Sequence, residues 1–393
     1  MGVVFEPIEA EFGWSRSETS LAASVSLLLY GLTAPFAAAL MQRFPVRVVV
    51  ASALCLVAFG SLGTTWMTAP WHMVLLWGGF VGVGTGSIAL VFGAIIANRW
   101  FVHRRGLVTG VFSAASATGQ LAFLPLIAVL AENYGWRAAS ILVAAVAVAI
   151  VPLALAFFAD TPADAGVRPY GADESYVAPE IHRLSLKQVA TNTVQMLFAA
   201  MRTRPWWILA FTFFVCGWST NGLMQTHFIS AAHDHGMPTT TAAGLLAIIG
   251  IFDIVGTVAS GWLTDRFDSR ILLVVYYGLR GLSLLYVPAV LGPHVEPPML
   301  FFMIFYGLDW VATVPPTVAL CRKHFGLEKS GVVYGWVFAA HMVGAGAGAS
   351  FAGAIRELHG AYTIAWVSAG VLCLIAALSF VAMPSTSAVS DNA

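Results

Sequence analysis

Charged residues are scarce in this chain. Asp, Glu, Lys and Arg make up 10% of its 393 residues, whereas a typical soluble domain carries about 25%. Hydrophobic residues make up 59% and the mean hydropathy is +0.82, which is far too apolar for a water-soluble fold. The 19 basic residues balance the 19 acidic ones, so the chain lacks the basic surface that binds nucleic acid. We therefore expect a protein that lies in the lipid bilayer and binds no nucleic acid.

Cysteine is also rare, and its positions exclude the usual metal sites. Cys55, Cys216, Cys321 and Cys373 share no metal-ligand spacing, so we interpret them as packing residues rather than disulfides or ligands. The glycine-rich run at 82–86 follows no strand and lies inside an apolar stretch. It therefore predicts close helix packing rather than a nucleotide-binding loop. We expect no enzymatic activity, no metal and no cofactor.

The chain repeats itself. The segment A38-A-L-M-Q-R-F-P-V-R47 returns 223 residues later as G261-W-L-T-D-R-F-D-S-R270, with the Leu, the Arg-Phe pair and the last Arg identical. At nearly the same offset, G106-L-V-T-G110 returns as G331-V-V-Y-G335. A duplicated apolar unit is typical of secondary transporters, which hold the substrate between their two halves.

Eleven apolar runs reach the length of about 20 residues that a bilayer crossing needs. They cover roughly 19–41, 46–68, 72–97, 106–130, 137–158, 206–229, 240–263, 270–291, 297–320, 331–355 and 362–383. We predict an all-α polytopic fold of two pseudo-symmetric six-helix bundles. The expected parts are an N-terminal bundle at 1–160, a cytoplasmic linker at 161–204, a C-terminal bundle at 205–385 and a tail at 386–393. Within the linker, residues 184–201 are expected to form a helix on the membrane surface.

The repeat also predicts which helix is short. Residues 206–229 would map, in the first half, to positions almost wholly before Met1, so only a last turn at Gly2–Pro7 is expected from that helix. This predicts about 20 further apolar residues upstream. The next helix is expected to open with a capping box between Ser15 and Glu18.

Basic residues divide unevenly between the two sides of the membrane. Fifteen of the 19 fall on one side, three on the other (Arg16, Arg137 and Arg356), and Arg280 lies inside a span. Because Lys and Arg are enriched in cytoplasmic loops, we predict a cytoplasmic membrane protein with a cytoplasmic C-terminus.

The repeated element resembles the loop signature of the major facilitator superfamily. The segments E11-F-G-W-S-R16 and A97-N-R-W-F-V-H-R-R-G106 further resemble its monocarboxylate-porter and oxalate/formate-antiporter branch. The resemblance implies a rocking bundle of helices in which the loop acts as a conformational latch. The latch residues expected from the two copies are Gly261, Asp265, Arg266, Arg270, Arg43 and Arg47. Asp265 is expected to pair with a basic residue or a helix N-terminus; the first copy has Gln42 where the family has an acid.

Four ionisable residues fall near one level of the C-terminal half. Counting about 1.5 Å of rise per residue, Arg280, Asp309 and His341 lie near the bilayer centre and Asp253 slightly inward. Charge there is costly, so it usually faces a partner or a cavity. Arg280 either pairs with Asp309 or Asp253, or binds the substrate carboxylate. Asp309, Asp253 and His341 are the candidates for proton coupling.

The span at 206–229 carries polar side chains where the resembled family has a cavity-lining helix. Asn221 and Gln225 are four residues apart and share a helix face, as do Trp218 and Asn221. With Arg280 and His341 they form the predicted substrate site, to which Gln120 contributes from the other half. Pro315 and Pro316 are expected to break the helix below Asp309 and make a gating bend.

The sequence thus predicts a monomeric secondary transporter for a small mono- or dicarboxylate. Transport would be coupled to protons or to a counter-anion by alternating access. Two alternatives remain open at this point: efflux of hydrophobic compounds, which tolerates loss of Arg280, and a transporter-like solute sensor, which binds without flux. Gly110–Pro125 lacks the Gly-Pro pair of the drug-exporting branches, which disfavours the first.

Overall fold

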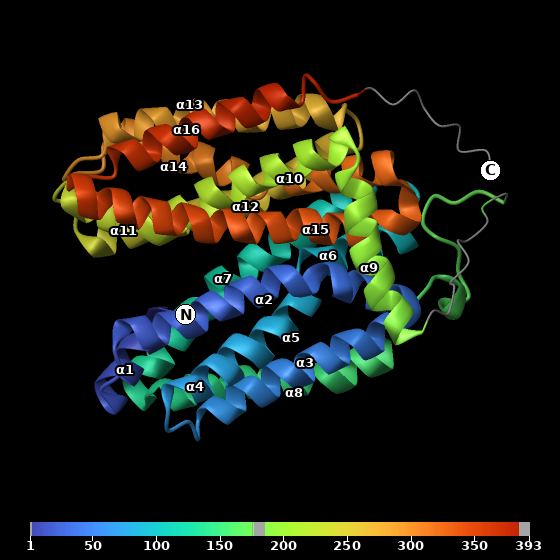
Figure 1. Cartoon of the computed structure of the whole chain (residues 1–393), viewed down its shortest axis with the longest axis horizontal. Coiled ribbons are helices and arrows are strands. Elements are labelled where there is room, and N and C mark those ends of the chain that lie inside the picture. The colour runs from blue at the N-terminus through green and yellow to red at the C-terminus, as the bar shows by residue number, and fades with distance from the viewer. Residues whose placement is uncertain (1, 175, 177–184, 385–393) are drawn as a thin grey trace. The chain divides into compact units, whose positions relative to one another are not determined.

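A computed structural model describes residues 2–174, 176 and 185–384 (Figure 1). Helices make up 83% of the chain, and the described part contains no strand, only an isolated bridge between Phe101 and Tyr170. The predicted all-α polytopic fold is confirmed. Two compact units form: residues 1–102 with 119–194 make unit 1, and residues 103–118 with 195–393 make unit 2.

Unit 1 is built mainly from apolar helices. The helix α2 opens with the predicted capping box, because Ser15 accepts from the Glu18 amide and the Glu18 carboxylate accepts from Ser15 N–H at 2.8 Å. The helices of this unit are α1 (Gly2–Phe12), α2 (Arg16–Arg43), α3 (Val46–Thr64), α4 (Pro70–Met73), the π-helix η1 (Val74–Val81), α5 (Gly82–Ser87), α6 (Leu90–Trp100), α8 (Trp136–Phe157) and the short 3₁₀ helix η2 (Ala163–Ala165), with the second half of α7 (Arg105–Tyr134).

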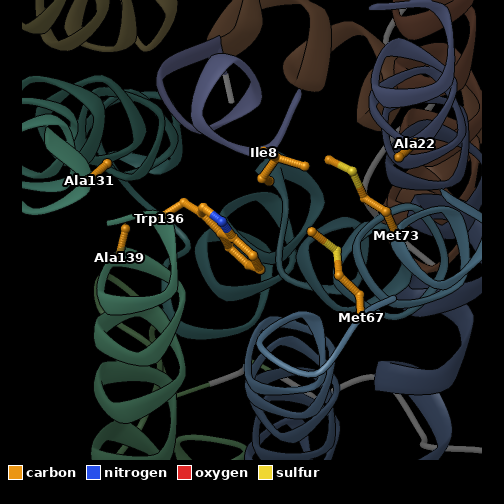
Figure 2. Close-up of a cluster of buried hydrophobic side chains, with 7 residues drawn as sticks. All are labelled: Ile8, Ala22, Met67, Met73, Ala131, Trp136 and Ala139. Atoms are coloured by element: carbon orange, nitrogen blue, oxygen red, sulfur yellow. The ribbon is translucent and has the colours of Figure 1, made fainter. Parts of the chain in front are cut away.

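The first helix extends beyond the single turn expected at Gly2–Pro7. It continues to Phe12 because Ile8, 1% exposed, enters a core with Met67, Met73 and Trp136 (Figure 2). Its 11 residues are fewer than the roughly 20 that cross a bilayer.

Unit 2 carries every ionisable residue predicted near the bilayer centre. Its α9 (Leu186–Met201), shared with unit 1, matches the helix expected in the linker. The others are α10 (Arg204–Gly217), the π-helix η3 (Trp218–Met224), α11 (Gln225–Asp234), α12 (Thr239–Thr264), α13 (Ser269–Val290), α14 (Pro297–Asp309), α15 (Val314–His359) and α16 (Thr363–Ser379).

Each of the eleven expected runs coincides with helical residues. In the described part of the chain, eight helical stretches are long and apolar enough to cross a membrane. One of them, Pro297–His359, covers two expected runs, and its α15 turns at Gly326, where φ is 78°. Only glycine adopts such a backbone at little cost, so the kink divides α15 into two segments.

Candidate functional site

A mostly buried π-helical segment, η3, lies between α10 and α11 in unit 2. The seven residues of η3 interrupt the α-helix between α10 and α11, and such segments often occur at functional sites. Two glycines allow the backbone of this region to approach α15 closely. A Cβ on Gly222 would come within 2.6 Å of the Ala345 carbonyl, and one on Gly348 within 2.7 Å of the Trp218 carbonyl. The close approach brings the polar residues of η3 against α15.

Three of the predicted substrate-site residues form a hydrogen-bonded row. His341 Nε2 lies 3.1 Å from Asn221 Oδ1, and Asn221 Nδ2 donates to Gln225 Oε1 at 2.7 Å. Because Asn221 Oδ1 only accepts, His341 donates through Nε2. His341 is 9% exposed whereas Gln225 is exposed, so the row leads from the interior of unit 2 to its surface.

Aromatic rings surround this row, which we call the imidazole–amide row. His341 lies 4.9 Å from the Phe213 ring and stacks on Phe338. Its buried Nδ1 makes no hydrogen bond of ordinary geometry among the described residues, although the Cys216 thiol lies close to the ring. Trp218 packs on Phe351, with ring centroids 5.1 Å apart. A protonated imidazole here would offer its second N–H as a donor to an anion.

Arg280 is fully enclosed and paired. Its Nε donates to Asp309 Oδ2 at 2.5 Å, and the two side chains are 0% and 6% exposed. The rings of Tyr277 and Tyr306 lie 5.6 and 5.9 Å from the guanidinium carbon. Removing one partner of a buried pair of this kind leaves the charge of the other without its counter-charge. Asp309 Oδ1 has no hydrogen-bond partner in the described part of the chain.

Asp253 accepts hydrogen bonds from residues outside the Arg280–Asp309 pair. It is 1% exposed, and its Oδ1 accepts from the Thr257 hydroxyl at 2.7 Å and from the Val311 N–H at 3.0 Å. Thr257 lies four positions later, about one turn along α12, and supports the acid with a neutral hydrogen bond.

Cys216 contributes to this network, although the sequence pattern suggested packing alone. Arg280 Nη1 donates to its sulfur at 3.2 Å, and the Thr313 hydroxyl lies 3.4 Å away. His341 also lies within electrostatic range of the thiol. No local signal pointed to this role, because its partners are 64 and 97 residues distant in sequence. Cys216 joins the Arg280 pair to the imidazole–amide row.

The duplicated loop places Asp265 at a helix N-terminus. Its two carboxylate oxygens accept from the N–H groups of Gly106 and Leu107, at 2.7 and 2.9 Å, where α7 begins. A Cβ on Gly106 would come 2.5 Å from the Gly261 carbonyl, so glycine is required for this approach. Helix N-termini favour negative charge, and Asp265 supplies it.

The arginines of the two loop copies contact aromatic rings and acidic side chains. Arg266 lies over the Trp262 ring at 3.9 Å, and Arg270 forms an ion pair with Asp268 at 2.8 Å. Hydrogen bonds from Arg270 lower the pKa of Asp268 to about 2. Asp268 therefore stabilises the fold above its unfolded pKa of about 3.9, and that contribution is lost as the pH falls towards 2.

In the first copy, Arg43 lies over the Phe44 ring at 4.9 Å, and Arg47 pairs with Asp160 at 3.5 Å. Gln120 lies on α7 in a stretch whose side chains are outside the described residues. Across the part of the chain that the structure describes, no group of three or more His, Cys, Asp and Glu side chains could hold a metal.

Asp265→Ala is expected to lower the stability of unit 2 by about 1–2 kcal/mol, because it leaves two helix N–H groups without a charged acceptor. Thermal unfolding in detergent measures the loss. Glu296→Ala is the matched control, since this exposed acid stands at the start of α14 without a capping hydrogen bond. An equal shift in both variants would contradict a capping role for Asp265.

Comparison with known proteins identifies the family. The sequence model of the Major Facilitator Superfamily matches residues 1–349. The chain is 27% identical over 391 residues to monocarboxylate transporter 13 of Bos taurus, covering 98% of this chain and 84% of that protein. It is 25% identical over 353 residues to YcxA, an uncharacterized MFS-type transporter of Bacillus subtilis (strain 168), covering 89% and 81%.

A solved structure has a similar fold. The E. coli fucose:proton symporter FucP matches with a TM-score of 0.67 and 17% identity, covering 98% of this chain and 95% of that one. The resemblance to the monocarboxylate porters, first indicated by the loop motifs, is confirmed at the level of the family. This chain belongs to the Major Facilitator Superfamily and is a multi-pass membrane protein of a transporter family.

Proposed function

We propose that this protein is a secondary active transporter that moves a small mono- or dicarboxylate across the cytoplasmic membrane by alternating access. The observation that carries the proposal is the imidazole–amide row, in which His341, Asn221 and Gln225 run from the interior of unit 2 to its surface. Two lines of support come from similar proteins: several relatives are named monocarboxylate transporters, and FucP is named a proton symporter.

The row offers what a carboxylate requires. A protonated His341 supplies a positive charge and an N–H at Nδ1, while Asn221 and Gln225 supply amide N–H groups. Trp218 provides an apolar wall for the rest of a small substrate. Arg280 is an equal candidate for the anion by sequence, but Asp309 and nearby acceptors occupy its donors. We therefore assign the carboxylate to His341, with Gln120 as the candidate from the N-terminal half.

Coupling to a proton or a counter-anion completes the proposed cycle. Asp309, Asp253 and His341 are the titratable groups available for the proton. The loop residues Gly261, Asp265 and Arg266, with Arg270, Arg43 and Arg47, would favour one conformation of the cycle. The working unit is proposed to be a monomer with a cytoplasmic C-terminus.

Uptake into proteoliposomes tests this function. The purified chain would be given radiolabelled lactate, pyruvate, formate, oxalate and succinate, each with and without a pH gradient. Saturable uptake of at least one carboxylate, inhibited by the unlabelled compound, is the expected result. Transport of hydrophobic compounds instead would indicate an exporter, and carboxylate binding without flux would indicate a sensor.

His341→Gln is expected to raise the half-saturating carboxylate concentration by about 10- to 100-fold, since a hydrogen bond to a charged group contributes about 1.5–3 kcal/mol. Glutamine keeps a donor for Asn221 but has no positive charge. The concentration dependence of initial uptake measures the change.

The matched control is His227→Gln on the helix that follows η3. His227 is half-buried, with Nε2 2.9 Å from the Ala349 carbonyl and Nδ1 3.3 Å from the Tyr362 hydroxyl. Its loss should leave the half-saturating concentration within about 2- to 3-fold of the unmodified chain. Unchanged affinity in His341→Gln would remove His341 from the anion site.

A further inference from the structure

The transmembrane segment that contains Asp309 is interrupted just after it. The α-helix α14 ends at Asp309, and α15 begins at Val314. The cause lies in Pro315 and Pro316. Neither has an N–H to donate to the carbonyl four residues earlier, and each ring clashes with that carbonyl. Residues 310–313 therefore leave the α-helix, and their backbone groups require other partners, because an unsatisfied backbone group in a bilayer is strongly unfavourable.

Two of those backbone groups are satisfied by neighbouring backbone. The Val314 N–H donates to the Val311 carbonyl at 2.9 Å, and the Trp310 N–H donates to the Gly307 carbonyl at 3.1 Å. Both are the tight bonds of a 3₁₀ turn, which connects helical segments over a few residues. These bonds alone do not provide partners for the carbonyls at 309, 310 and 312 or for the amide at 311.

Side chains from α12 and α13 provide the missing partners. Arg280 Nη2 donates to the carbonyls of Asp309 and Trp310, at 2.5 and 3.2 Å. The Ser260 hydroxyl donates to the Ala312 carbonyl at 2.5 Å, and Asp253 accepts from the Val311 N–H. Arginine, serine and aspartate thus each complete part of the interrupted backbone. We call Asp253, Ser260 and Arg280 the interruption clamp.

The clamp is built into the packing of unit 2. Asp253, Thr257 and Ser260 are spaced by four and three residues, so they share one face of α12. Each is at most 1% exposed. Gly256 lies on the same face of α12, and a Cβ on it would overlap the Leu308 backbone of α14. A Cβ on Gly307 of α14 would come 2.7 Å from the Ile249 carbonyl of α12. These glycines let α12 lie close enough to α14 for its short side chains to reach residues 311 and 312.

We propose that Asp253 and Ser260 are positioning residues for transport, which with Arg280 hold residues 310–313 as a hinge and fix the place of Asp309. The role of these residues in transport rests on the proposed function, whereas the clamp as a structural feature does not. A backbone held by side chains bends without breaking a helical hydrogen-bond ladder, and prolines are the usual sites of such bends. Asp253 then acts through an acceptor oxygen and not as a proton carrier.

The charges around Asp253 fit this role. Arg280 on α13, Asp309 on α14 and Cys216 on α10 are the titratable groups that act on it electrostatically. Arg280 is shared between the Asp309 carboxylate and the hinge carbonyls, so Asp253 remains free to accept from Val311 and Thr257. Asparagine at position 253 keeps an acceptor of the same shape but cannot carry a proton. Alanine at position 253 has neither an acceptor oxygen nor a group that can carry a proton.

Hydrogen exchange of the intact chain in lipid nanodiscs, without added ligand, tests the clamp. In a peptide covering residues 306–314, Ser260→Ala and Asp253→Ala are each expected to speed exchange by about 10-fold, the loss expected when a buried group loses its partner. Asp253→Asn should stay within about 3-fold of the unmodified chain. Ser368→Ala is the matched control, because its hydroxyl bonds within α16.

Two results would overturn the inference. One is an unchanged exchange rate of residues 306–314 in Ser260→Ala. This variant alone tests the clamp if Asp253→Ala fails to fold. The other is exchange in Asp253→Asn as fast as in Asp253→Ala. Uptake of labelled lactate by Ser260→Ala and Asp253→Ala gives a separate readout. A positioning role predicts that both variants have a lower maximal rate of uptake and an unchanged half-saturating concentration. Absence of any carboxylate uptake, with the exchange pattern intact, would refute the proposed function and leave the clamp standing.

Discussion

Arg280→Ala is expected to destabilise the protein by about 3–5 kcal/mol, the cost of removing one partner of a buried ion pair. The change leaves the Asp309 carboxylate enclosed without a counter-charge and removes the Arg280 donor from the carbonyls at 309 and 310. Combining it with Asp309→Asn removes the unpaired charge and should restore much of the stability. Thermal unfolding in detergent, with the yield of folded protein, measures both variants.

The surface pair Arg356–Asp234 is the matched control. Its side chains are 39% and 24% exposed and lie 2.6 Å apart, so Arg356→Ala should cost at most about 1 kcal/mol. Arg280→Ala should also become more stable as the pH falls, because protonation of Asp309 relieves its unpaired charge. A stable, well-folded Arg280→Ala that has lost only carboxylate affinity would instead place the substrate at Arg280.

The helices of this protein could be predicted from sequence because lipid imposes one strong constraint. A segment that crosses the bilayer must satisfy its own backbone, so an apolar run of sufficient length becomes a helix. The capping box at Ser15 and Glu18 and the break before Pro315 could be predicted for similar local reasons. Each depends on a few neighbouring residues whose chemistry is visible in the sequence.

The partners of the central residues could be predicted only in part. Counting residues gives the depth of Arg280, Asp309 and Asp253, but not the direction in which each side chain points. One residue turns an α-helix by about 100°, so a small error in helix phase changes the facing neighbour. The π-helix η3 adds such a phase change before Gln225. The roles of Cys216 and Ser260 were missed because their partners lie on other helices.

Asp309→Asn is expected to abolish proton-driven accumulation of carboxylate while retaining exchange of labelled for unlabelled substrate. Asparagine fixes the neutral state, so a carrier with this change can no longer take up and release a proton at position 309. Exchange does not need that step, because the loaded carrier returns without changing its protonation. Net uptake under a pH gradient and exchange in preloaded proteoliposomes measure the two activities separately.

The charge of Arg280 makes this test informative. A guanidinium keeps its proton in proteins, so a neutral asparagine at position 309 leaves Arg280 with backbone carbonyls, Cys216 and two tyrosine rings around it. If Asp309 releases and regains a proton in every cycle, the fold must tolerate that neutral state, and the variant should fold and exchange. If the variant fails to fold, Asp309 is a fixed counter-charge, and the proton belongs to one of the other titratable groups, His341 or Asp253. Normal proton-driven accumulation would remove Asp309 from coupling altogether.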